Sequence, residues 1–320
     1  MRTRTKVWLI IAASLVLLGC LLFTGVMTTL GWDFFKLSTA KYETNTYEIS
    51  EAFDSISMNT DTADIAFVLS NDGNCRVECH EEEKAKHSVT VEEGTLTIKL
   101  FYGRAGYFGL NFGSPKITVY LPKAEYTSLL ISEDTGDIEI PKGFSFNNVE
   151  ISLSTGDVTF SASASEMIQI KTSTGDVCVE NVSAGALDLS VSTGKVTVSG
   201  VTCEGDVIVG VSTGKASLTD TQCDSVISGG STGDIFLNRV IAAEKISIHR
   251  STGDVKFESC DAAEIFVKTD TGDVTGSLLS NKVFITETDT GSISVPNSDT
   301  GGRCEITTDT GDIEIKVHKK

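Results

Sequence analysis

The sequence predicts an all-β protein, a β-solenoid of about ten coils of 19–20 residues, preceded by one N-terminal transmembrane helix. Three observations lead to this prediction. A Thr-Gly pair recurs ten times at a nearly constant spacing, apolar and polar residues alternate on both sides of each pair, and an uncharged apolar run begins the chain. A fixed period of about 20 residues is typical of proteins in which each repeat stacks on its neighbours.

The start of the chain predicts a membrane anchor. Residues 1–6, MRTRTK, carry three positive charges and are expected to stay cytoplasmic, residues 7–31 to cross the membrane, and residues 32–41 to form a linker. The uncharged part from Val7 to Leu30 is about 36 Å long as a helix, enough for a bilayer core of about 30 Å. The body would then lie outside the cell, in a single-pass protein of the cell membrane.

Two other fates of this segment would also export the body. Leu17–Cys20 reads LLGC, which resembles a lipoprotein cleavage box with Cys20 as the lipidated residue, and the segment also has the form of an ordinary signal peptide. The apolar run continues for ten residues past Cys20, which a lipoprotein does not require. An uncleaved anchor is therefore the preferred prediction.

Each repeat is centred on a glycine that follows a threonine, with serine or aspartate before the threonine. The ten turn glycines, 19 or 20 residues apart, are Gly136, Gly156, Gly175, Gly194, Gly214, Gly233, Gly253, Gly272, Gly291 and Gly311. A weaker copy, NTDTADIAF, precedes them with Ala63 in place of glycine. Glycine supplies the positive φ that tight turns of this kind need.

The flanks of each glycine predict two short, half-buried strands per copy. Ile168 and Ile170 precede Gly175, and Val177 and Val179 follow it, with polar residues between them. A chain of hairpins and a solenoid both satisfy this pattern. A twenty-strand meander would exceed the usual size of an open sheet and would not need a fixed period, whereas stacked coils must keep register. We therefore predict a solenoid over residues 126–320, behind a β head or cap over residues 42–125.

Aspartate follows the turn glycine in seven copies: Asp137, Asp157, Asp176, Asp234, Asp254, Asp273 and Asp312. Carboxylates stacked about 4.8 Å apart repel one another, so they need water, backbone N–H donors or a cation. Calcium is one candidate because it binds several oxygens. Lys195, Lys215 and Ser292 interrupt the column, however. We therefore expect solvated turn aspartates that bond backbone N–H groups, and no bound metal.

The eight cysteines form no C-x-x-C pair. Cys75 and Cys79 are too far apart along one strand to bridge each other. Cys203 and Cys223 share a coil position, nine residues past the turn glycine, in a column of mostly small residues: Ser165, Ala184, Cys203, Cys223, Ala242 and Ala262. A separation of about 4.8 Å permits a disulfide there. Buried free thiols are the preferred interpretation, and the bridge stays open.

No residue set identifies a reaction. GVSTG, residues 210–214, matches the G-x-S-x-G pattern of a nucleophile elbow, but it is one of ten repeat turns in a chain with four histidines. A carbohydrate-active β-helix enzyme would need a carboxylate cluster outside the repeat register, and none is evident. We expect no catalytic residues and no cofactor. The net charge of −18 argues against nucleic acid as a partner.

The segment FYGRAGYFGLNFGSP is the best sequence candidate for an interaction loop. Glycines separate five aromatic residues in it, namely Phe101, Tyr102, Tyr107, Phe108 and Phe112. Exposed aromatics are typical of contacts with sugars, proteins or membrane surfaces. Rings folded over the open end of the stack are an equally good interpretation.

Four features together carry a family resemblance. These are a positive N-terminus with one apolar span, KYETNTYEIS after the linker, a strand-rich head ending in PKITVYLPK, and serial STGDV and DTGDI copies. Nearly the whole chain resembles the adhesin-type β-strand-repeat family known as domain of unknown function 4097, and it looks closest to membrane-anchored members from Gram-positive anaerobes. The resemblance implies a surface β-solenoid without catalytic residues, and some relatives act in envelope stress sensing.

The sequence thus favours a non-enzymatic surface protein that binds a glycan or protein ligand, in the manner of an adhesin. The alternative is an envelope sensor or regulator that binds a partner on its own cell. The predicted cytoplasmic part of about six residues leaves only partner-mediated signalling to that alternative. The oligomeric state is left undetermined.

Overall fold

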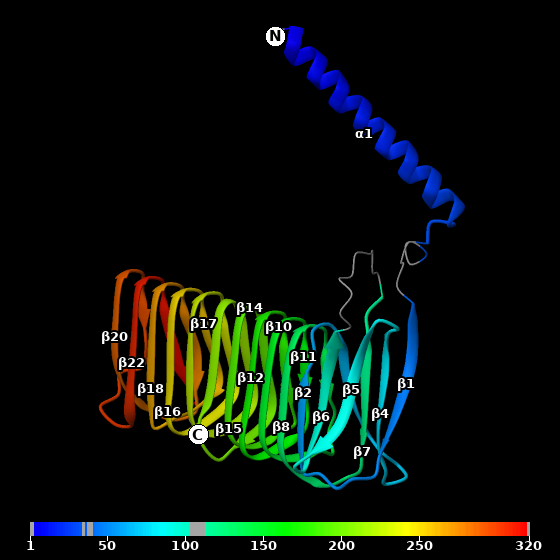
Figure 1. The fold of residues 1–320 in the computed structure, drawn as a ribbon. Helices are drawn as coiled ribbons and strands as arrows, with labels where there is room; N and C mark the ends of the chain where they lie inside the picture. The colour runs from blue at the N-terminus through cyan, green and yellow to red at the C-terminus, as the bar shows by residue number, and fades with distance from the viewer. Residues whose placement is uncertain (1–2, 34–35, 37–40, 103–112, 319–320) are drawn as a thin grey trace.

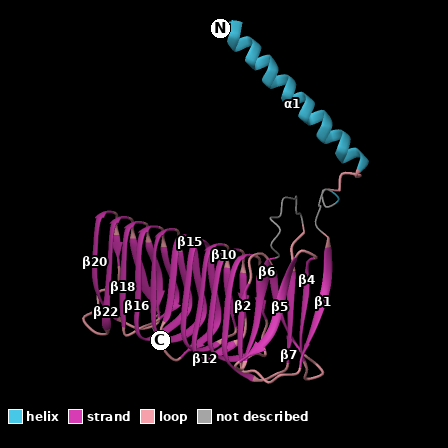
Figure 2. Cartoon of the chain, in the orientation of Figure 1, coloured by secondary structure: helices cyan, strands magenta, loops and turns pink. Residues whose placement is uncertain are grey.

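The computed structural model describes residues 3–33, 36, 41–102 and 113–318 (Figure 1). Its one long helix, α1 (Thr3–Thr29), precedes a body made of strands (Figure 2). Residues Thr5–Thr29 have a mean hydropathy of 2.6, so α1 is long and apolar enough to cross a membrane. The fold class predicted from the repeats, an all-β solenoid behind one apolar helix, is confirmed.

Seven strands make up the region before the regular repeats: β1 (Tyr42–Ile49), β2 (Ser55–Asn59), β3 (Asp64–Leu69), β4 (Cys75–Glu82), β5 (Ala85–Glu92), β6 (Thr95–Tyr102) and β7 (Lys116–Leu121). Strand β4 pairs antiparallel with β1, β5 and β7, and β5 pairs antiparallel with β6. By contrast, β2 and β3 pair parallel with the first strands of the solenoid. The weak copy at Ala63 therefore forms a coil, with Ala63 N–H bonded to Thr135 O at 3.0 Å.

The solenoid strands pair parallel from one coil to the next, and apart from local register shifts the same position of each repeat stacks in a column. They are β8 (Glu125–Thr135), β9 (Ile138–Ile140), β10 (Ser145–Thr155), β11 (Val158–Phe160), β12 (Ser163–Thr174), β13 (Val177–Glu180), β14 (Ser183–Cys203), β15 (Val207–Thr232), β16 (Ile235–Thr252), β17 (Val255–Cys260), β18 (Glu264–Thr271), β19 (Val274–Leu278), β20 (Lys282–Thr290), β21 (Ile293–Ser294), β22 (Gly302–Thr310) and β23 (Ile313–Val317).

Left-handed backbone occurs at two kinds of corner in the coils. All ten turn glycines have positive φ, as the sequence predicts. A second corner follows six residues later, where five coils place Asn181, Gly200, Asp220, Arg239 and Ser259 at φ between 50° and 64°. Four of these five are not glycine, and the corner therefore leaves little trace in the sequence.

The last coils do not stack in chain order. Strand β22 pairs with β18 on one side and β20 on the other, so the final repeat lies between the two repeats that precede it. Gly301 and Gly302 permit this insertion. A Cβ there would lie 1.9 Å from Asn281 O and 1.8 Å from Ala263 O, respectively. Residues 282–294 consequently form the outermost coil (Figure 1).

The core is a continuous stack of inward-facing aliphatic side chains. Ile151, Ile170, Leu189 and Val209 occupy one column and are all fully buried. Because neighbouring coils bury the same position, the hydrophobic effect stabilises the stack as a whole rather than single coils.

Arg250 is the main exception to this apolar core. It is fully buried, and its Nη1 donates to Val211 O, two coils away, at 2.7 Å, whereas Nε and Nη2 have no partner in the described part of the chain. Gly230, in the intervening coil, makes room for the guanidinium, because a Cβ there would lie 1.8 Å from Nη1. Burial lowers the pKa of Arg250 from its ordinary value, while Asp234 opposes the shift.

Candidate functional site

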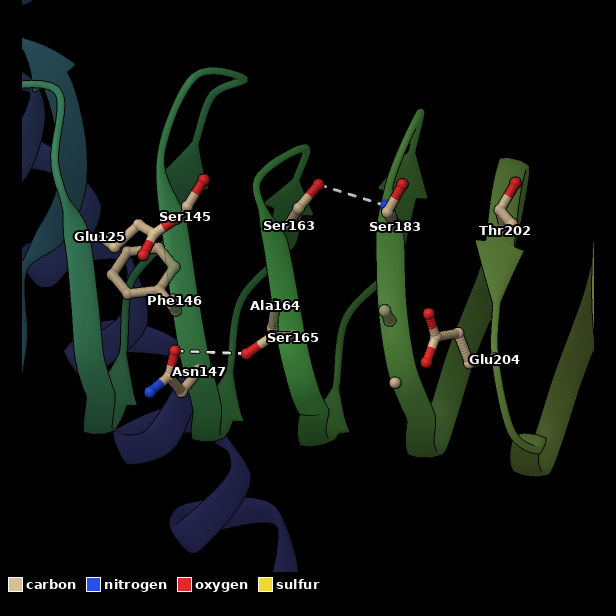
Figure 3. Close-up of a pocket in the computed structure, with 12 residues that line it drawn as sticks. Glu125, Ser145, Phe146, Asn147, Ser163, Ala164, Ser165, Ser183, Thr202 and Glu204 are labelled. Atoms are coloured by element: carbon tan, nitrogen blue, oxygen red, sulfur yellow. Dashed lines mark hydrogen bonds between the residues drawn. The ribbon is translucent and has the colours of Figure 1, made fainter.

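A groove of about 550 Å³ crosses successive coils on one side of the solenoid (Figure 3). We call it the hydroxyl groove. Its polar lining residues are Glu125, Ser145, Asn147, Ser163, Ser165, Ser183, Thr202 and Glu204, and its floor contains Phe146, Ala164, Ala184 and Gly185. The lining is thus mostly hydroxyl, amide and carboxylate groups above small residues.

Register explains why the hydroxyls gather. Ser145 pairs with Ser163 across β10 and β12, and Ala164 pairs with Ala184 across β12 and β14, so equal positions of each coil face the groove. Register shifts between Phe146 and Asn148, and between Ala164 and Met167, mark local irregularities beside it. The small residues Ala164, Ala184 and Gly185 leave the space that forms the groove.

Two hydrogen bonds join lining residues of the groove to one another. Ser165 Oγ donates to Asn147 Oδ1 at 3.2 Å, and Ser163 Oγ accepts from Ser183 N–H at 3.2 Å. Glu125 and Glu204 lie at opposite ends of the labelled set (Figure 3). Hydroxyls both donate and accept, while carboxylates accept only, so the groove suits a ligand rich in hydroxyl groups.

Sequence reasoning missed this groove. The hydroxyl column Ser145, Ser163, Ser183 and Thr202 lies 11 or 12 residues before a turn glycine, and that regular offset was a usable signal. The structure also corrects the small-residue column. Ala164, not Ser165, pairs with Ala184, because the repeat at β12 contains a register shift. Ser165 is exposed and lines the groove instead.

The aspartates after the turn glycines form a hydrogen-bonded ladder. Asp137 Oδ1 accepts from Asp157 N–H at 2.9 Å, and Asp157 Oδ1 accepts from Asp176 N–H at 2.7 Å. The same bond joins Asp64 to Asp137, Asp176 to Lys195, Asp234 to Asp254, Asp254 to Asp273, Asp273 to Asp312 and Asp312 to Ser292. Each carboxylate therefore satisfies the backbone of the next coil.

This ladder accounts for the aspartate column without a metal ion. At the interruption, the Nζ of Lys215 lies 2.9 Å from Asp234 Oδ2, and this hydrogen bond lowers the pKa of the Asp234 carboxyl. At the outermost coil, bonds from the Ser292 backbone and hydroxyl lower the pKa of Asp312. Backbone and side-chain donors thus supply the compensation that stacked carboxylates need.

We expect Asp157→Ala to lower the free energy of unfolding by about 0.5–2 kcal/mol, the usual cost of removing a capping side chain from a backbone N–H. Asp157→Asn should cost much less because its amide oxygen still accepts the bond. Urea denaturation of both variants measures the difference, with and without millimolar Ca²⁺. A rise in wild-type stability with Ca²⁺ that Asp157→Asn abolishes would contradict the backbone role.

Only part of the aromatic segment lies within the described residues. Phe101, at the end of β6, is 69% exposed. Tyr102 ends the same strand, while Tyr107, Phe108 and Phe112 lie outside the described residues. The structure therefore adds one exposed ring to the prediction of an interaction loop and leaves the loop itself a prediction.

The cysteines are free thiols, including Cys203 and Cys223. Burial raises the pKa of Cys223 to about 12, and burial also raises that of Cys203. Such thiols are unreactive at neutral pH because the thiolate is the nucleophile. Ser212 of the GVSTG match is exposed within β15, and a strand-to-helix elbow is absent from residues 207–232.

Comparisons with known proteins give a family match and several similar solved structures. The family model Toastrack DUF4097 matches residues 53–210 and 205–320. A "Putative lipid binding protein" from Parabacteroides distasonis has a TM-score of 0.53 at 16% identity, over 87% of this chain and 98% of its own. A "putative adhesin" from the same species has a TM-score of 0.45 at 12% identity, over 87% and 98% of the two chains.

A "putative adhesin" from Bacteroides fragilis has a TM-score of 0.36 at 17% identity, over 86% of this chain and 97% of its own. Comparison with curated protein sequences gives no match. At these identities the first of the three structures supports the fold alone.

Proposed function

The chain belongs to the DUF4097 family, and from that premise we propose that it is a non-enzymatic surface scaffold whose hydroxyl groove binds a glycan. One observation carries the proposal, namely the column of hydroxyl side chains that the coil register aligns across β10, β12 and β14. A sugar chain offers hydroxyl groups that both donate and accept, and it can follow the groove from coil to coil.

Charge narrows the choice of ligand. The protein has a net charge of −18, and Glu125 and Glu204 line the groove. An anionic polymer would be repelled, so a neutral or amino-substituted glycan fits better. The relative described as lipid-binding suggests an acyl chain as the other ligand class, but a lining of hydroxyls, an amide and carboxylates disfavours it.

We also propose that α1 anchors the scaffold in the cell membrane, with the N-terminus in the cytoplasm and the body outside. Support comes from the apolar segment Thr5–Thr29 and from the three basic residues in MRTRTK. In this arrangement the membrane is a partner through α1, and the groove is available to ligands at the cell surface.

The test uses full-length protein in detergent micelles and isolated wall polysaccharides as probes. We expect Ser165→Arg to weaken glycan binding at least tenfold, because the longer side chain fills the groove. Thr159→Arg is the matched control, since Thr159 is an exposed hydroxyl residue of β11 that does not line the groove. Equal binding by both variants, or no binding by the wild type, would contradict the proposal.

Photo-crosslinking on intact cells separates the adhesin from the alternative. A photoreactive residue at position 165 should capture glycan, whereas one at position 159 should not. If position 165 instead captures one membrane protein of the same cell, the chain acts as a sensor or regulatory partner and the glycan proposal is wrong.

A further inference from the structure

The head contains a buried cluster of three side chains of the kinds that bind metal ions. Cys79 and Glu81 lie on the inward face of β4, two residues apart, and His87 lies on β5. Cys79 Sγ, a Glu81 carboxylate oxygen and a His87 ring nitrogen all lie within 4.8 Å of one another. Cys79 and Glu81 are fully buried, and His87 is 4% exposed.

Hydrogen bonds already hold the carboxylate of this cluster in place. Asn45 Nδ2 donates to Glu81 Oε1 at 2.7 Å, and His87 N–H donates to Oε2 at 2.6 Å. His87 Nδ1 lies 2.7 Å from the same Oε2. The carboxylate is thus oriented by two neighbouring strands, as the carboxylates around protein metal sites usually are.

One ring atom in the cluster is left over. Nε2 of His87 is buried and has no hydrogen-bond partner in the described part of the chain. A buried polar atom without a partner is costly and rare in folded proteins, so it calls for an explanation. The ring thus has one nitrogen, Nδ1, against the Glu81 carboxylate and a second, Nε2, that the described residues do not satisfy.

We propose that Cys79, Glu81 and His87 form a binding site for a borderline divalent metal ion, Zn²⁺ in particular. Zinc prefers this mixture of sulfur, nitrogen and oxygen ligands, whereas calcium and magnesium prefer oxygen alone. A tetrahedral zinc ion with ordinary bond lengths holds such atoms about 3.3–3.6 Å apart. The three ligand atoms lie within 4.8 Å of one another, and the 2.7 Å contact between His87 Nδ1 and Glu81 Oε2 has to open for one ion to bind both groups.

Charge balance favours the ion in this buried place. A thiolate, a carboxylate and a neutral imidazole together neutralise Zn²⁺, so the loaded site has no net charge to desolvate. On binding, the ion replaces the thiol proton of Cys79, which leaves to water. It also replaces the hydrogen bond between Glu81 Oε2 and His87 Nδ1: the ion binds the lone pair of Nδ1, and the one ring proton of the neutral imidazole resides on Nε2. No electron moves in this exchange, and a water molecule can complete the coordination.

The site would tie together the hairpin of β4 and β5. These strands are joined to each other by a single paired position, Glu82 with Ala85, before β5 turns to pair with β6. Glu83 N–H bonds Lys41 O at 2.9 Å, so the hairpin also contacts the segment that leads in from α1. A metal ion here would fix the head where the chain enters it.

Metal titration of the full-length protein in detergent micelles tests the site. After removal of metals with a chelator, we expect one equivalent of Zn²⁺ to bind and to raise the melting temperature by several degrees. Co²⁺ should bind in the same place and give a sulfur-to-cobalt charge-transfer absorption, which reports a thiolate ligand directly.

Variants locate the site. Cys79→Ser should abolish the Co²⁺ charge-transfer band, and Glu81→Gln and His87→Gln should each weaken Zn²⁺ binding at least tenfold. Cys75→Ser is the matched control, because Cys75 is a buried cysteine on the same strand and face, outside the cluster. It should keep both the band and the affinity.

If a variant fails to fold, the wild-type protein still tests the site. Absence of a charge-transfer band in folded wild-type protein with excess Co²⁺ would overturn the proposal. A band that is lost in Cys75→Ser but kept in Cys79→Ser would overturn it equally, since the thiolate would then belong to another site.

Discussion

Replacing Gly214 by alanine should destabilise the solenoid by 3 kcal/mol or more, because two independent penalties act at this turn. Gly214 has φ +135°, a backbone conformation that residues with a side chain rarely adopt. An added Cβ would also lie 1.8 Å from the carbonyl oxygen of Gly194 in the adjacent coil. Neither coil can move away without breaking the parallel pairing of β14 with β15.

Gly229→Ala provides the matched control. It makes the same substitution in the same strand, β15, at a position where nothing lies within 4 Å of the added Cβ. We expect its stability to stay within about 0.5 kcal/mol of the wild type. Chemical denaturation of both variants is the measurement, and similar stabilities for the two would contradict the role assigned to the turn glycines.

Much of this fold could be predicted because its determinants are local and repeated. Each Thr-Gly copy marks a turn, and alternation around it, as at Ile168, Ile170, Val177 and Val179, marks strands with one buried face. Ten repetitions of a weak local signal make a strong one. The solenoid follows because only stacked coils require so constant a period.

The order of the last coils could not be predicted, because the repeats are so alike. Since every repeat presents nearly the same edge, the local pattern does not say which coil will lie beside which. The insertion of β22 between β18 and β20 depends on Gly301 and Gly302 fitting against Ala263 and Asn281, which are distant in sequence. A contact of this kind leaves no periodic trace.

The candidate sites also differ in whether a repeated sequence signal marks them. The aspartate column could be recognised in the sequence because it repeats. The sequence also predicted that these carboxylates bond backbone N–H groups, and the structure shows that the N–H groups belong to the adjacent coil. The hydroxyl groove and the Cys79–Glu81–His87 cluster depend on packing that brings separate strands together. A register shift at β12 moved Ser165 to the surface, and the period alone does not reveal such a shift.

We also expect the buried carboxyl of Glu133 to make the stability of the protein strongly dependent on pH. This carboxyl lies in the inward column at the junction with the head and is 3% exposed. Its Oε1 accepts from Ala63 N–H at 2.9 Å, and its Oε2 has no partner among the residues that the structure describes. Burial raises its pKa to about 8, and nearby Asp61, Asp134 and Asp64 add to the shift, while the Ala63 bond opposes it.

The direction in which stability changes with pH follows from the difference between the pKa of Glu133 in the folded and unfolded protein. Because the pKa of Glu133 is raised above its ordinary value of 4.5, the folded protein holds a proton that the unfolded chain releases. Its contribution to stability is fully present below pH 4.5 and is lost as the pH rises through about 8. A shift of this size corresponds to at most about 5 kcal/mol.

Glu133→Gln should remove this loss, since the amide keeps an acceptor for Ala63 N–H and carries no charge at any pH. Urea unfolding at pH 5 and pH 9 should therefore show the variant gaining stability over the wild type at pH 9 and little at pH 5. Glu139→Gln, at an exposed position of β9, is the control and should follow the wild type. Parallel curves for wild type and Glu133→Gln would show that the carboxyl is already ionised in the fold. In that case the ionised oxygen must have a partner at the head junction, and the cost of burying Glu133 would be met by hydration rather than by protonation.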